Sequence, residues 1–297
     1  MSESTITANG ISIAYDEFGK QDDPVILLIM GLGTQMIAWT EEFCLGLVAK
    51  GYRVVRFDNR DVGLSQKFDD QKPPNLLKGL IAQKLGVKIS TPYTLFDMAD
   101  DAIGVMDALA IKRAHIVGAS MGGMISQILA AEHPERVISL TSIMSTSGHK
   151  SLPSASWDVT KHMIARKAVG SEADYLDQMV SFWQVIGSPK YMPEEQALRE
   201  RMSESFNRCY YPMGYKRQLV AIAACGDRVE LLKRITVPTC VIHGRSDVLV
   251  PVEGGIDTAR HIKHSTLEVI DGMGHDLPRP LYGQFIGLIT DNANKVA

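Results

Sequence analysis

The stretch HIVGASMGGMISQILA, residues 115–130, joins a strand-like segment to a helix-like segment through one serine. Residues 115–118 are typical of a buried strand, and residues 124–130 carry apolar side chains at helical spacing. Ser120 has Gly118 and Gly122 two positions away on either side, which is the G-x-S-x-G pattern. Glycines at these positions relieve crowding in a sharp turn that exposes the serine hydroxyl above the sheet. The context therefore favours a nucleophile at Ser120 over a serine that only caps a helix.

A serine hydroxyl needs a general base, and the base needs an orienting carboxylate. In strand–turn–helix hydrolases of this pattern the chain order is serine, acid, histidine. Asp247 follows the strand-like TCVIHG, and His275 follows the strand-like STLEVID. Each residue alone has the ordinary interpretation of a polar loop position. Together, in the required order and each after a strand, they predict a triad of Ser120, His275 and Asp247.

The rest of the chain alternates between strand and helix patterns. Strands are expected at 11–15, 24–31, 52–58, 114–118 and 137–144, and helices at 39–50, 95–109 and 124–133. This alternation predicts a mostly parallel sheet flanked by helices. Residues 147–232 carry helical patterns without a convincing strand, and strand patterns return at 239 and 265. We therefore expect a core domain of residues 1–146 and 234–297, with a helical cap inserted at 147–233.

Composition excludes several classes of partner. The chain has 297 residues, a net charge of −3 and no basic run, so neither nucleic acid nor an anionic membrane is expected. The longest apolar run is far shorter than the roughly 20 residues that span a bilayer, and no signal-peptide pattern is visible. The four cysteines are scattered, and neither a dinucleotide loop nor a phosphate loop occurs. We expect a cytoplasmic protein without metal or cofactor, and a homodimer is left open.

Four segments resemble a known superfamily. They are LLIMGLGTQMIAW at 27–39, FDNRDVGLS at 57–65, TPYTLFDMADDA at 91–102 and VGASMGGMI at 117–125. The chain resembles the α/β-hydrolase fold superfamily over nearly its whole length, and within it the aclacinomycin methylesterase-type hydrolases. The stretch at 58–65 resembles the superfamily pattern D-x-R-G-x-G-x-S but has Asp61 and Val62 before Gly63, and we expect it to hold a loop near the site.

The resemblance also implies an oxyanion hole made by two backbone amides. Met121 N–H, at the start of the helix after the serine, is one expected donor. By position the other is Leu32 N–H, in a loop that has Met30 and Gly31 where many relatives carry His-Gly. The residues expected to contact the substrate are Met30, Trp39, Met144, Trp183 and Met213.

These features predict hydrolysis of a carboxylic ester through an acyl-enzyme on Ser120. Apolar and polarizable side chains near the site suit a small to medium hydrophobic ester as the substrate. Three alternatives use the same fold. They are a carbon–carbon bond hydrolase, a cofactor-free perhydrolase, and a ligand receptor that does not turn over.

Overall fold

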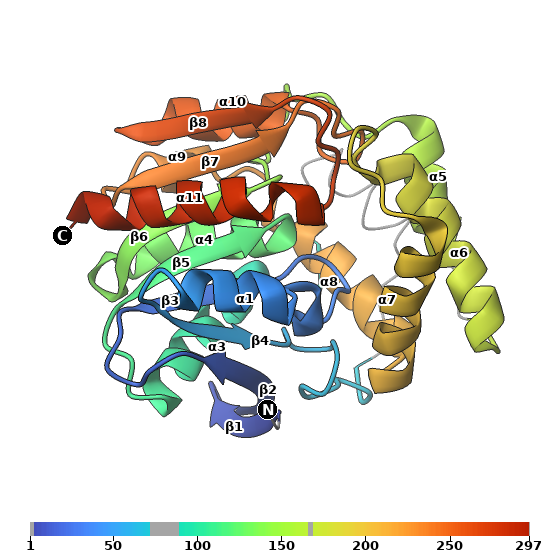
Figure 1. Ribbon diagram of the computed structural model, residues 1–297, viewed down its shortest axis with the longest axis horizontal. Coiled ribbons are helices and arrows are strands. Elements are labelled where there is room, and N and C mark those ends of the chain that lie inside the picture. The colour runs from blue at the N-terminus through green and yellow to red at the C-terminus, as the bar shows by residue number, and fades with distance from the viewer. Residues whose placement is uncertain (1–2, 72–88, 166–168, 297) are drawn as a thin grey trace.

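A computed structural model of the protein describes residues 3–71, 89–165 and 169–296. Its centre is an eight-stranded sheet in the order β1-β2-β4-β3-β5-β6-β7-β8 (Figure 1). The strands are β1 (Ser4–Ala8), β2 (Ile11–Phe18), β3 (Val25–Ile29), β4 (Arg53–Phe57), β5 (Ala114–Ala119), β6 (Val137–Ile143), β7 (Thr239–Gly244) and β8 (Ser265–Ile270). All neighbours from β4 to β8 are parallel, while β1 and β2 pair antiparallel. The prediction of a mostly parallel sheet is confirmed.

Helices cover both faces of this sheet. They are α1 (Glu41–Val48), α3 (Leu95–Ala108), α4 (Met121–Glu132), α10 (Glu253–His261) and α11 (Tyr282–Ala293), with short 3-10 turns η1 (Met36–Ala38), η2 (Pro134–Arg136), η3 (Arg279–Leu281) and η4 (Asn294–Val296). In Figure 1, α1 and α11 lie side by side in front of the sheet, and they contact each other. The helices α3 and α4 contact each other on the opposite face. Because both faces are covered, β3 is buried at every position.

The N-terminal strands differ from the sequence prediction, which placed the first strand at 11–15. β1 pairs antiparallel with β2, and β2 continues to Phe18. Its charged residues face arginines of the neighbouring strand β4. Asp16 lies 2.8 Å from Arg56, and Glu17 lies 2.6 Å from Arg53. These cross-strand ion pairs let the strand continue through the acidic residues that follow position 15.

Between β6 and β7 the chain forms a group of helices. They are α5 (Trp157–Ala165), α6 (Glu172–Ile186), α7 (Glu195–Arg208), α8 (Pro212–Cys225) and α9 (Val229–Leu232). The described part of residues 147–233 contains no strand. Figure 1 shows α5, α6 and α7 beyond one end of the sheet. No helix in the described ranges combines the length and apolar character needed to cross a bilayer.

Buried polar contacts connect α8 to the loop that follows β4. The Arg217 guanidinium donates to both carboxylate oxygens of Asp61, with Nε 2.7 Å from Oδ2 and Nη2 2.8 Å from Oδ1. Tyr93 Oη also donates to Asp61 Oδ2, at 2.6 Å. Both members of the ion pair are almost completely buried. Asp61 departs from the superfamily pattern at its position. It is the ion-pair partner of Arg217 on α8.

Candidate active site

Ser120 lies on a sharp turn between β5 and α4. Its backbone has φ 56° and ψ −117°, a strained conformation for a residue with a side chain. A Cβ atom added at Gly118 would lie 2.2 Å from the carbonyl oxygen of Gly122. One added at Gly122 would lie 2.1 Å from the carbonyl oxygen of Ile29. Only glycine fits at these two positions, which explains the pattern found in the sequence.

Two loops bring Asp247 and His275 to the serine. His275 follows β8, and its Nε2 lies 2.9 Å from Ser120 Oγ. The other ring nitrogen, Nδ1, lies 2.7 Å from Asp247 Oδ2. The three residues predicted as a triad, separated by up to 155 positions, therefore form one hydrogen-bonded line.

Backbone amides orient the Asp247 carboxylate. Its Oδ1 accepts hydrogen bonds from Leu249 N at 2.9 Å and Val250 N at 2.8 Å. Its Oδ2 lies 2.7 Å from His275 Nδ1 and 3.5 Å from His243 Nε2. Burial opposes ionisation of Asp247, but the charge of His275 and hydrogen bonds from both histidines outweigh burial and lower its pKa to about 2.

The low pKa of Asp247 predicts a loss of stability in acid. Its pKa falls from the usual 3.8 to about 2 on folding, so ionised Asp247 stabilises the fold fully above pH 3.8. This stabilisation disappears as the pH drops towards 2. Between these limits the wild type should lose on the order of 2 kcal/mol of unfolding free energy relative to Asp247→Asn. Urea unfolding followed by fluorescence at several acidic pH values measures this difference, and parallel pH dependences in the two proteins would contradict it.

The loop after β3 lies against the serine. A Cβ added at Gly31 would lie 3.1 Å from Ser120 Cβ, so the backbone of this loop packs directly on the Ser120 side chain. Leu32 follows Gly31, and Met121 follows Ser120 as the first residue of α4. The amides of Leu32 and Met121 therefore belong to segments that meet at Ser120, as an oxyanion hole requires.

A cavity of about 500 Å³ opens at Ser120 and His275. Of the residues predicted to contact substrate, Met30, Met144 and Trp183 line it. Trp39 and Met213, also predicted to contact substrate, do not line it. Trp39 is fully buried and packs on Phe43, with ring centroids 5.3 Å apart.

Met213 misses the cavity because of its angular position on α8. The residues of this helix that line the cavity are Tyr215, Leu219 and Ile222. At about 100° per residue these three share one face, and Met213 lies on the opposite face. A helical wheel drawn from the sequence places Met213 opposite these three residues. The sequence does not show which of the two faces meets the cavity.

Several lining residues were missed by the sequence analysis. Helix α6 contributes Tyr175, Met179 and Ile186, and their spacing of three and four with Phe182 is the signal that could have found them. The other methionines of the wall are Met124, Met163 and Met202. The sequence analysis had also assigned no arginine to the site, yet Arg201 lines the cavity.

Among the described residues, no group of three or more His, Cys, Asp or Glu side chains could hold a metal ion.

Comparison with known proteins gives a family match and distant relatives. A family model described as alpha/beta hydrolase fold matches residues 24–278. Rhodomycin D methylesterase from Streptomyces sp. (strain C5) is 25% identical over 92% of this chain and 92% of its own. The 3-oxoadipate enol-lactonase 2 of Acinetobacter baylyi is 26% identical over 91% of this chain and 88% of its own.

A solved structure has the same fold. The meta-cleavage product hydrolase from Pseudomonas fluorescens IP01 superposes with a TM-score of 0.78 at 20% sequence identity. The likeness covers 99% of this chain and 98% of that one. At this identity it shows the shared fold and no more.

Proposed function

The chain belongs to the α/β hydrolase fold family, and from this premise we propose that it hydrolyses carboxylic esters with Ser120, His275 and Asp247 as a catalytic triad. The observation that carries the proposal is the hydrogen-bonded line from Asp247 through His275 to Ser120, which ends in the cavity. The apolar and methionine-rich wall supports a small to medium hydrophobic ester as the substrate.

The geometry supports a two-step acyl transfer. His275 Nε2 takes the proton of Ser120 Oγ as that oxygen attacks the acyl carbon, and the carbonyl electrons move onto the acyl oxygen. The amides of Leu32 and Met121 stabilise this oxyanion. The tetrahedral intermediate collapses, and the alcohol leaves with the proton from His275. The acyl group then stays on Ser120.

Water completes the cycle by the same route. His275 removes a proton from water, the hydroxide oxygen bonds to the acyl carbon, and Ser120 Oγ leaves with that proton. Throughout, Asp247 holds the ring and stabilises the imidazolium. The depressed pKa of Asp247 supports this role because it keeps the carboxylate ionised.

Two relatives support an ester as the bond that is cleaved. One is named as a methylesterase and the other as an enol-lactonase, and a lactone is a cyclic ester.

We also propose that residues 147–233 act as a cap over a core formed by 1–146 and 234–297. Support comes from α6, α7 and α8, which contribute residues to the wall of the cavity that Ser120 also lines.

Hydrolysis of short and medium p-nitrophenyl esters tests the proposal. We expect repeated turnover and, after rapid acid quench, an acyl group on the Ser120 peptide detected by mass spectrometry. Turnover of a dienoate ring-cleavage product without ester turnover would instead indicate a carbon–carbon hydrolase. Peracid formation from acetate and peroxide would indicate a perhydrolase, and a single slow turnover would indicate a receptor.

A further inference from the structure

A glutamine on α8 holds the loop that carries Leu32. Gln218 is completely buried, and its Oε1 accepts a hydrogen bond from Gly33 N at 2.8 Å. Its Nε2 donates to the carbonyl oxygen of Arg60, also at 2.8 Å. Gly33 N can only donate and Arg60 O can only accept, so the partners permit a single orientation of the amide. Gln218 therefore fixes the residue next to Leu32.

The contact between α8 and this loop is close. Gly33 has φ +62°, and a Cβ added there would lie 2.8 Å from a ring carbon of Tyr215. The loop thus passes α8 at a distance that only glycine allows, in a conformation that glycine adopts readily. The position of the loop depends on that of α8.

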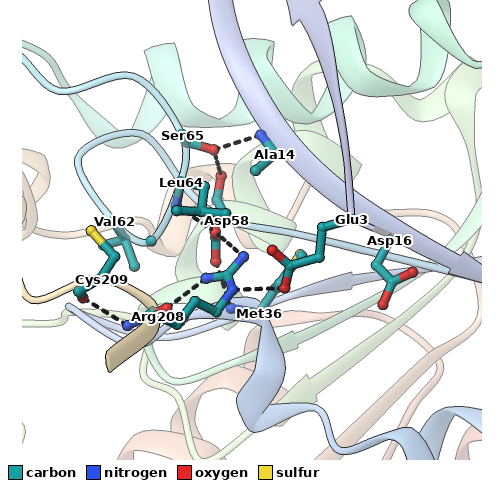
Figure 2. Close-up of polar contacts among 12 residues, drawn as sticks. Glu3, Ala14, Asp16, Met36, Asp58, Val62, Leu64, Ser65, Arg208 and Cys209 are labelled. Atoms are coloured by element: carbon teal, nitrogen blue, oxygen red, sulfur yellow. Dashed lines mark hydrogen bonds and ion pairs between the residues drawn. The ribbon is translucent and has the colours of Figure 1, made fainter. Parts of the chain in front are cut away.

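Arg208, the last residue of α7, secures the far end of the same loop. Figure 2 shows its guanidinium between the carboxylates of Asp58 and Glu3. Arg208 Nη2 lies 2.7 Å from Asp58 Oδ2, and the other Asp58 oxygen accepts from Met36 N at 2.8 Å. Arg208 Nη1 donates to Gln35 Oε1 at 2.5 Å. One side chain of α7 therefore links to both Gln35 and Met36.

The Gln35 side chain strengthens this link. Its Nε2 donates to the carbonyl oxygens of Ser205 at 2.6 Å and Cys209 at 2.9 Å. At the near end of the loop, Asn59 Nδ2 donates to Met30 O at 2.8 Å. The Leu32 amide thus lies between an anchor on the sheet side, at Met30, and anchors from α7 and α8, at Gly33 and Gln35.

We propose that Gln218 is a positioning residue for the oxyanion donor Leu32, and that Arg208 secures the same loop from α7. This inference rests on the proposed ester hydrolysis. Neither residue touches a reacting atom. An oxyanion donor acts only within about 2.7–3.1 Å of the charged oxygen, so a small shift of the loop weakens transition-state binding while leaving substrate binding intact. The helices between β6 and β7 then contribute to catalysis as well as to the cavity wall.

The test compares a p-nitrophenyl ester with its thionoester, in which sulfur replaces the acyl oxygen and accepts hydrogen bonds poorly. Gln218→Met keeps the side-chain length and removes both hydrogen bonds. We expect kcat/KM for the ester to fall about 30-fold through kcat, and that for the thionoester to change less than about threefold. The ester-to-thionoester ratio therefore falls about tenfold or more. A merely structural defect lowers both rates together and leaves the ratio unchanged.

Two further variants keep the test decisive. Gln196→Met makes the same chemical change on the exposed side of α7, where Gln196 contacts Glu200, and should leave both rates at wild-type values. Arg208→Lys keeps a charge opposite Asp58 but loses the fork that reaches Gln35, and should lower the ratio less. The inference is overturned by a wild-type ratio in Gln218→Met or, if that protein does not fold, in Arg208→Lys. Absence of ester turnover in the wild type overturns this inference and the proposed function together.

Discussion

Ser120→Ala should lower kcat/KM for ester hydrolysis by about 10⁵-fold while the protein remains folded. Without Oγ no acyl-enzyme forms, and only binding and oxyanion stabilisation remain to assist attack by water. Alanine keeps the Cβ that packs against Gly31 and meets the same backbone strain that serine already meets at φ 56°. The lost contact is the hydrogen bond of 2.9 Å to His275, so the melting temperature should change little.

The measurement is initial-rate hydrolysis of p-nitrophenyl esters with a thermal melt of each protein. Ser145→Ala is the matched control, because the Ser145 hydroxyl is buried and no described residue forms a hydrogen bond with it. It should retain wild-type turnover. If Ser120→Ala and the wild type hydrolyse esters equally fast, Ser120 is not the nucleophile and the assignment fails.

Asp247→Asn should reduce kcat by about 10⁴-fold near neutral pH. The two amides of Leu249 and Val250 donate to Oδ1 of Asp247, and in the variant they should hold the carbonyl oxygen of the new amide. The amide nitrogen then faces His275 Nδ1 and donates to it. His275 must accept at Nδ1 and carry its proton on Nε2, which removes the lone pair that accepts the serine proton.

A second aspartate–histidine pair supplies the control. Asp257 Oδ2 lies 3.5 Å from His261 Nδ1 on α10 and accepts from Ser147 Oγ at 2.5 Å. Asp257→Asn should keep wild-type turnover even if it lowers stability, because this pair does not contact the predicted triad. Unchanged turnover in Asp247→Asn would show that another group orients His275.

Local patterns predicted the sheet well where strands are fully buried. The run at β3 is continuous and apolar, and β3, β4 and β5 are buried at every position between two covered faces of the sheet. The prediction failed at the N-terminal edge. β1 has a single buried residue, and the end of β2 carries acids whose partners, Arg53 and Arg56, are about 40 positions away. Single-sequence patterns do not contain such cross-strand partners.

The candidate site was likewise predicted well in one part and less well in another. Ser120, Asp247 and His275 each directly follow or lie just beyond a strand, and parallel strands bring their carboxyl ends to one edge. Their positions after successive strands along the sequence were therefore enough to predict that the three side chains meet. The cavity wall was predicted less well. Trp39 and Met213 lie outside it, and the lining residues Tyr175, Met179 and Ile186 of α6 were missed. Which face of a helix meets a cavity depends on how that helix packs.

By itself, the sequence determined the buried strands, the glycine-lined turn at Ser120 and the order of the three polar residues, because steric crowding and hydrophobic burial act over a few neighbouring positions. Only the tertiary structure decided how Gln218 and Arg208 hold the loop of Leu32, and which side chains form the cavity. Those contacts join residues 150 or more positions apart. They depend on the distances and orientations that chain packing sets after the local elements have formed.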